Sequence, residues 1–251
     1  MEPSALLVLT FAAFATSILS AIVGMAGGIV LLSVMLLYLD PLVAIPLHGA
    51  VQLVSNGSRT WIQRHHVERR IAWRYALLLL PMGVVGLYIA QSLSPPVTRA
   101  LIGVFVLLAT WAPGALMLGT HPEQADRDRR FLLLGGVVGV LNMTIGATGP
   151  LIAPFFLNLG LTRQAVIGTK AACQTLGHLA KLAIFGAAGF AFLAWATPLL
   201  LLCAAVVVGT WAGSRILGHV SEVWFTRLYK TVLTVIALRL VVLELLELAT
   251  G

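Results

Sequence analysis

Long apolar stretches, separated by short polar connections, run along the whole chain. Most of them are close to the length of about 20 residues that a helix needs to cross a bilayer. No polar block is large enough to fold as a separate aqueous domain, so residues 1–251 are expected to form one membrane domain. The predicted transmembrane helices are 41–62, 73–92, 96–118, 164–186, 193–214 and 224–246.

Two further apolar stretches are too long for one crossing and are interrupted by glycine. Residues 5–39 and 131–161 overshoot the bilayer at about 1.5 Å per helical residue. The first contains Gly24-Met25-Ala26-Gly27-Gly28 and the second contains Gly146-Ala147-Thr148-Gly149-Pro150, both rich in residues that end or kink helices. The arm after each break is too short to cross alone. Each stretch is therefore predicted to form a re-entrant helical hairpin whose tip lies inside the membrane.

The two interrupted stretches also indicate an internal repeat. Aligning Gly24 with Gly146 places Gln52 on Gln174 without a gap. Polar residues inside apolar helices are rare enough to give this match weight. The predicted fold is all-α and polytopic, with two repeats that each contain a hairpin followed by three transmembrane helices. The repeats cover about 5–118 and about 131–246.

Charge in the connections predicts how the repeats are oriented. The connection after helix 41–62 is rich in arginine, whereas the equivalent residues 187–195 carry no charge. Cytoplasmic loops are enriched in arginine and lysine, so equivalent loops of opposite charge character belong on opposite sides of the membrane. The repeats are therefore predicted to be inverted, with both termini outside and the 119–130 loop in the cytoplasm. The arginines of the first connection are Arg59, Arg64, Arg69, Arg70 and Arg74.

Composition supports the membrane prediction and narrows the function. The chain is 59% hydrophobic and 10% charged, whereas soluble domains carry about 25% charged residues. The net charge of +7 lies in the loops, so it calls for no nucleic-acid partner. The first segment lacks the basic residues that precede the apolar core of a cleaved signal peptide, and we expect it to be retained.

Motifs for catalysis and for cofactors are missing from the sequence. No serine or cysteine comes with a recognisable base and orienting acid, and there is no nucleotide-binding loop. Cys173 and Cys203 lie in apolar runs without metal-ligand spacing, and the pair His65-His66 has no carboxylate or thiol cluster beside it. We therefore expect no enzyme, no cofactor and no metal site.

The two breaks are the first candidates for a binding site. A half-helix that begins inside the membrane directs unpaired N–H groups and the positive end of its dipole into the protein, where they attract anions. Two such ends that meet near the midplane would hold one small anion. The alternative is that the glycines only allow helices to pack closely. The candidate ligands are Gly24, Met25, Ala26, Gly27, Gly28, Gly146, Ala147, Thr148 and Gly149.

Polar stripes on the helix after each hairpin supply further candidates. Their members recur every four residues, which places each set on one helical face at matching depths. The alternative is that Lys170 snorkels to the interface and that the amides only bridge helices. Ser55, Asn142 and Lys181 are weaker candidates. The stripes are His48, Gln52 and Asn56 in one repeat and Lys170, Gln174 and His178 in the other.

The positions of the carboxylates disfavour cation transport. The nine acidic residues lie in connections, near the ends of predicted spans or at the termini, whereas a cation pump or sodium symporter usually places one mid-membrane. If protons are coupled to transport, His48 or His178 would have to carry them, because histidine titrates near neutral pH.

With these residues in view, the chain resembles the TauE/SafE (sulfite exporter) family. The resemblance rests on the two glycine motifs at matched positions and on the helix after each, and it covers nearly the whole chain. It implies a multi-pass protein of a prokaryotic cell membrane that moves sulfite, sulfonates such as sulfoacetate, or related organosulfur anions, often outward. Gly28 against Pro150, and His48 against Lys170, make the two halves of the site unequal.

The expected mechanism is alternating access, with the anion held by backbone N–H groups and by Gln52, Gln174 and Lys170. The expected partners are this small anion and the lipid bilayer, and a homodimer is one state compatible with the sequence. A carrier of another small anion, such as a carboxylate, remains an alternative, because helix termini do not distinguish the two groups. A membrane-embedded enzyme or an assembly subunit is a further alternative.

Overall fold

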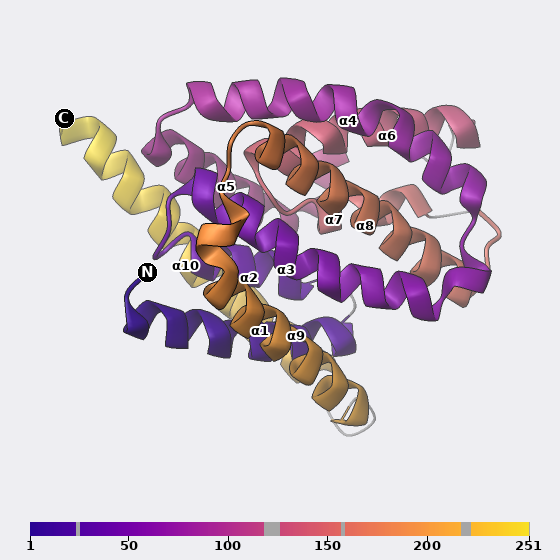
Figure 1. Cartoon of the computed structure of the whole chain (residues 1–251), viewed down its shortest axis with the longest axis horizontal. Helices are drawn as coiled ribbons and strands as arrows, with labels where there is room; N and C mark the ends of the chain where they lie inside the picture. Colours follow the sequence, from indigo (N-terminus) through magenta and orange to yellow (C-terminus); the bar gives the residue numbers. More distant parts are fainter. Residues whose placement is uncertain (24–25, 118–125, 157–158, 217–221, 251) are drawn as a thin grey trace.

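The computed structural model describes residues 1–23, 26–117, 126–156, 159–216 and 222–250, and the regular structure of these residues is helical throughout (Figure 1). The α-helices are α1 (Pro3–Val23), α2 (Ala26–Met35), α3 (Pro41–Ile62), α4 (Arg69–Ser92), α5 (Pro95–Trp111), α6 (Arg127–Thr144), α7 (Gly149–Ile152), α8 (Arg163–Ala187), α9 (Ala196–Ile216) and α10 (Glu222–Thr250). Short 3-10 turns are η1 (Arg64–His66), η2 (Pro113–Met117), η4 (Ala153–Phe156) and η5 (Phe192–Trp195).

The predicted helices are present, with small differences at their ends. Helix α3 has the predicted bounds, and α5 ends at Trp111, short of the predicted end, because the chain passes through Ala112 to Pro113 and a 3-10 turn. By length and hydropathy alone, Pro3–Ser20, Arg69–Ser92 and Phe192–Gly213 qualify as membrane spans among the described residues. Helices α3 and α8 fall outside this set because their polar stripes lower the hydropathy.

Local sequence explains where several helices begin. Asp40-Pro41 and Ser94-Pro95 place a proline in the first turn of α3 and of α5, where its fixed φ suits a helix and its missing N–H costs nothing. At the start of α8 the hydroxyl of Thr162 accepts a hydrogen bond from the backbone N–H of Ala165 at 3.3 Å. This N-cap satisfies one of the free donors at the helix end.

Helices α3 and α8 pack against each other in the middle of the molecule (Figure 1). The backbone of Gly49 approaches the side chain of Lys181, and the hydroxyls of Thr60 and Thr175 lie 2.9 Å apart. Farther along, Gly168 of α8 lies against Gln63 just after α3. Because low numbers on α3 meet high numbers on α8, the two helices run antiparallel.

The other close pairs each join the two halves of the chain. Helix α1 packs on α9, α4 on α6, and α5 on α10, and in Figure 1 the α1–α9 and α4–α6 pairs lie on opposite sides of the central helices. Glycine allows the close approach, since a Cβ on Gly135 would overlap the carbonyl of Tyr75. Likewise, a Cβ on Gly209 would overlap the carbonyl of Phe14.

Large apolar side chains cover the outside of this bundle. Leu7, Tyr88 and Leu200 are exposed by 72%, 76% and 71%. A soluble protein rarely leaves so much apolar surface in contact with water, whereas lipid solvates it well. The exposed surface of the fold therefore matches the membrane environment that the sequence predicts.

Candidate functional site

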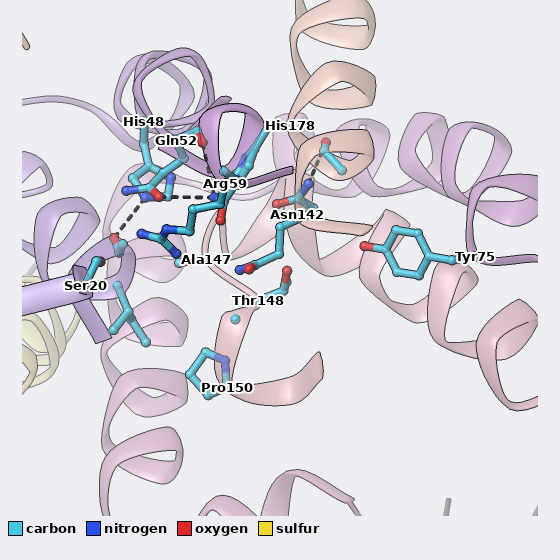
Figure 2. Close-up of a pocket in the computed structure, with 16 residues that line it drawn as sticks. Ser20, His48, Gln52, Arg59, Tyr75, Asn142, Ala147, Thr148, Pro150 and His178 are labelled. Atoms are coloured by element: carbon cyan, nitrogen blue, oxygen red, sulfur yellow. Dashed lines mark hydrogen bonds between the residues drawn. The ribbon is translucent and has the colours of Figure 1, made fainter. Parts of the chain in front are cut away.

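A small polar cavity lies where α3 and α8 meet the two helix breaks (Figure 2). Its volume of about 30 Å³ gives room for on the order of two water molecules. Nine of the main candidates from the sequence line it, in addition to the weaker candidate Asn142, and they come from both repeats. They are Gly28, His48, Gln52, Asn56, Ala147, Thr148, Gly149, Gln174 and His178.

The polar stripe of α3 lines the cavity over successive turns. His48, Gln52 and Asn56 all face it, and the amide of Asn56 donates to the carbonyl oxygen of Gln52 at 3.1 Å. From α8, Gln174 and His178 face the same space. The rings of His48 and His178 stand edge to face with centroids 6.0 Å apart. The stripes predicted from spacing therefore meet across the interface between α3 and α8.

Lys170 is the one member of the stripes that does not line the cavity. It is half-buried, one turn before Gln174 on α8.

The first break contributes Gly28, whose missing Cβ leaves room for the side chain of Gln52, 3.2 Å from where that Cβ would be. Gly27 does not line the cavity, because it packs against the carbonyl of Thr16 and the hydroxyl of Ser20. Of the other candidates here, Gly24 and Met25 lie outside the described residues, and Ala26 is described by its backbone alone.

The second break runs from the end of α6 at Thr144 to the start of α7 at Gly149. Gly146 has φ +85°, a left-handed conformation that glycine adopts without strain. It does not line the cavity, and its carbonyl accepts a hydrogen bond from Lys181 Nζ at 2.7 Å. Ala147, Thr148 and Gly149 do line it, and among the described residues their N–H groups find no hydrogen-bond acceptor.

The arm after this break is α-helical for only four residues. Pro154 lacks an N–H and interrupts the helix, which continues as the 3-10 turn η4. The helix dipole that the sequence suggested here is therefore small. The free N–H groups of 147–149 are the donors that this break offers to the cavity.

Several buried polar atoms around the cavity also have no protein partner. Within the described part of the chain, His48 Nδ1, Tyr75 Oη, Asn142 Oδ1 and His178 Nδ1 make no hydrogen bond. Burying a polar group without a partner is costly, so such atoms usually face bound water or a ligand. The cavity is therefore suited to bind water or a polar ligand.

Sequence reasoning missed part of the cavity wall. The sequence places Arg59 among the arginines of the connection predicted to be cytoplasmic, whereas in the structure it lies in the last turn of α3 and lines the cavity. Two features of the sequence indicate that position: Arg59 lies three residues after Asn56 on the same helix, and the repeat alignment places it on Lys181. Asn142, a weaker candidate, lines the cavity and donates to the carbonyl of Gly177 at 2.8 Å. The other lining residues that were not proposed are Ser20, Ile29, Tyr75, Pro150 and Gly177.

The charge of the lining is positive. Arg59 is its formal cation, and no aspartate or glutamate belongs to the described lining. Elsewhere in the described ranges, no group of three His, Cys, Asp or Glu side chains is arranged to hold a metal ion. The described lining therefore carries a positive formal charge and no carboxylate, which favours an anion over a cation as its ligand.

A helical bundle with an apolar exterior, two interrupted helices and a polar cavity between them is the architecture of a membrane transporter. Comparison with known families agrees with this class. The chain belongs to the family described as sulfite exporter TauE/SafE, whose model matches residues 9–240. No curated protein and no solved structure matches the chain.

Proposed function

We propose that this chain exports sulfite, a sulfonate or a related small organosulfur anion across a prokaryotic cell membrane by alternating access. Membership of the sulfite exporter family supports the substrate class. The observation that carries the proposal is the donor-rich cavity between the two helix breaks, which has no carboxylate in its described lining.

The donors suit an oxyanion with three oxygens. The N–H groups of Ala147, Thr148 and Gly149 are free on one side of the cavity, and the amides of Gln52 and Gln174 lie on other sides. Successive free N–H groups form a concave anion site even without a long helix. In a water-poor interior these hydrogen bonds to a charged guest are stronger than they would be in water.

Pairs of equivalent residues around the cavity support a mechanism based on inverted repeats. Ser20 and Asn142 occupy matching positions, as do Gln52 and Gln174, and all four face the cavity. The helix pairs match in the same way, because α1 with α9 is the counterpart of α6 with α4. Rocking one repeat against the other would open the cavity first to one side of the membrane and then to the other.

Flux measurements on the purified chain in liposomes test this function. Labelled sulfite and methanesulfonate are expected to cross the bilayer faster than in protein-free liposomes, and acetate is expected to cross at the protein-free rate. Selective acetate flux would support the carboxylate carrier instead. An absence of flux for all three anions would contradict the transport function of the isolated chain.

A further inference from the structure

Arg59 faces the cavity and not the loop that follows α3. It lies in the last turn of α3, is half-buried and lines the cavity. Figure 2 shows its side chain extending into the space that Gln52, Ala147 and Thr148 also face. Side chains on a helix lean toward its N-terminus, which directs Arg59 back into the protein and away from the loop that follows.

The hydrogen bonding of Arg59 leaves its charge uncompensated. Its Nη2 donates to the hydroxyl of Ser55 at 3.2 Å, and the guanidinium forms no ion pair with any described carboxylate. A buried or half-buried cation in a membrane protein is normally paired, because an isolated charge is costly there.

Three arginines near the start of α4 and α6 do have carboxylate partners. Arg70 and Arg74 lie 2.6 and 3.0 Å from the carboxylate of Asp128, and Arg127 lies 3.0 Å from that of Glu68. The hydrogen bond from Arg70, followed by the nearby positive charges, holds the pKa of Asp128 below its ordinary value, so this carboxylate is ionised. Arg59, which lines the cavity, has no such carboxylate partner among the described residues.

A second cation, Lys170, lies on α8 one turn before Gln174, which lines the cavity. Lys170 is half-buried, and it too forms no ion pair within the described ranges. Two positive charges without an ion pair in an apolar surrounding raise the energy of the protein when no anion is bound. An anion bound near them would supply the ion-pair partner that both lack, and a dianion would do so more completely than a monoanion.

We infer that Arg59 is the charged ligand of the transported anion and that, together with Lys170, it makes the cavity prefer dianions to monoanions. This inference rests on the proposed transport function and specifies its substrate class. A guanidinium can donate two parallel hydrogen bonds to two oxygens of one anion. The free N–H groups at 147–149 then remain for the third oxygen, and Lys170 compensates the second negative charge.

The test compares binding of dianions and monoanions by calorimetry at mildly alkaline pH, where sulfite is mainly doubly charged. Sulfite and sulfate are the dianion probes, and methanesulfonate and acetate are the monoanion probes. The variants are Arg59→Gln, Arg59→Lys and Lys170→Gln. Arg64→Gln is the matched control, because Arg64 is an exposed arginine just after α3 that contacts the ring and carbonyl of Trp61.

Arg59→Gln is expected to weaken dianion binding by about 10- to 100-fold, the range for a lost hydrogen-bonded charge, and monoanion binding by less. The ratio of dianion to monoanion affinity therefore falls. Arg59→Lys is expected to retain part of that ratio, because it keeps the charge but loses the bidentate geometry. Arg64→Gln should leave every affinity unchanged.

An unchanged ratio in Arg59→Gln would overturn the inference, as would an equal loss for both classes of anion. If Arg59→Gln does not fold, the ratio of dianion to monoanion affinity in Lys170→Gln tests the inference, and an unchanged ratio there would overturn it. If the wild-type protein binds and transports these anions and Arg59→Gln keeps the dianion preference, the role of Arg59 is refuted and the transport function is not. A wild-type protein that neither binds nor moves any of them refutes the transport function itself.

Discussion

Individual polar side chains hold backbone carbonyls at the two helix breaks. Lys181 is fully buried and donates to the carbonyl of Gly146, and His48 Nε2 lies 2.8 Å from the carbonyl oxygen of Gly28. In a membrane interior no water is available for a carbonyl that leaves the helical hydrogen-bond pattern. The Lys181 contact therefore stabilises the second break, where Gly146 lies between α6 and α7, and the His48 contact joins α3 to the first turn of α2.

Replacing Lys181 with methionine tests this stabilisation. Lys181→Met keeps most of the side-chain volume but leaves the Gly146 carbonyl without its donor, so the free energy of unfolding is expected to fall by about 1–3 kcal/mol. Thermal unfolding in detergent measures the effect. Arg69→Met, at an exposed position at the start of α4, serves as the control. Equal melting temperatures for Lys181→Met and wild type would show that the contact does not stabilise the break.

Gln174 is the residue at which the binding role of the amides can be tested. Gln174→Leu keeps a similar volume and removes the donor and the acceptor, so the affinity for sulfite is expected to fall about 10-fold while the helix content is unchanged. Calorimetry measures the affinity and circular dichroism the helix content. Gln91→Leu, at an exposed position of α4, is the control. Full affinity in Gln174→Leu would remove this residue from the binding site.

At the scale of elements, small residues set how closely helices approach around the cavity. Helices α4 and α6 run parallel, and Gly135 and Gly139 of α6 meet the backbone of α4 at Tyr75 and Leu79. Tyr75 itself lines the cavity with its hydroxyl unpartnered among the described residues. The α4–α6 spacing therefore positions part of the cavity wall.

Two adjacent glycines of α6 allow a matched test of this spacing. A Cβ on Gly135 would overlap the Tyr75 carbonyl, whereas a Cβ on Gly136 would lie 3.5 Å from its nearest neighbour. Gly135→Ala is expected to destabilise the protein by about 1–3 kcal/mol through overpacking. Gly136→Ala is expected to be neutral or to stabilise the helix by up to about 1 kcal/mol. Similar melting temperatures for the two variants would refute the close α4–α6 contact.

At the scale of the whole molecule, the directions of two helix pairs bear on the predicted inverted topology. Helices α3 and α8 run antiparallel, and so do α5 and α10, where Trp111 Nε1 donates to Thr234 at 2.8 Å while Arg99 lies 3.5 Å from Glu244. If α3 crosses inward, α8 then crosses outward. The loops that follow these two helices are thus expected on opposite sides of the membrane.

Cysteine labelling from outside the cell tests that topology. In a background without Cys173 and Cys203, a membrane-impermeant maleimide is expected to label Ala188→Cys and to leave His65→Cys unlabelled until the cells are opened. Both positions are exposed in the structure. Labelling of the two positions from the same side would contradict the inverted arrangement.

The helices could be predicted from the sequence because their causes are local. Apolar length, proline in the first turn and glycine at the breaks act within a few residues. Helix α3 therefore has its predicted bounds, and both long apolar stretches are divided into separate helices near their glycine motifs. The arm beginning at Gly149 is shorter than the apolar pattern suggested. The pattern counts hydrophobic residues, whereas Pro154 acts on the hydrogen bonds of the helix.

The amino-acid sequence by itself determined that this is a helical membrane protein with two glycine-rich breaks and two polar stripes, since spacing along a helix decides which residues share a face. Only the tertiary structure decided which of those residues meet. In the sequence, Arg59 resembles the arginines of the following loop. The packing of α3 against α8 and the second break places it in the cavity lining. Lys170, at matching depth in its stripe, is left beside that cavity, because the position of a long side chain depends on the helices around it.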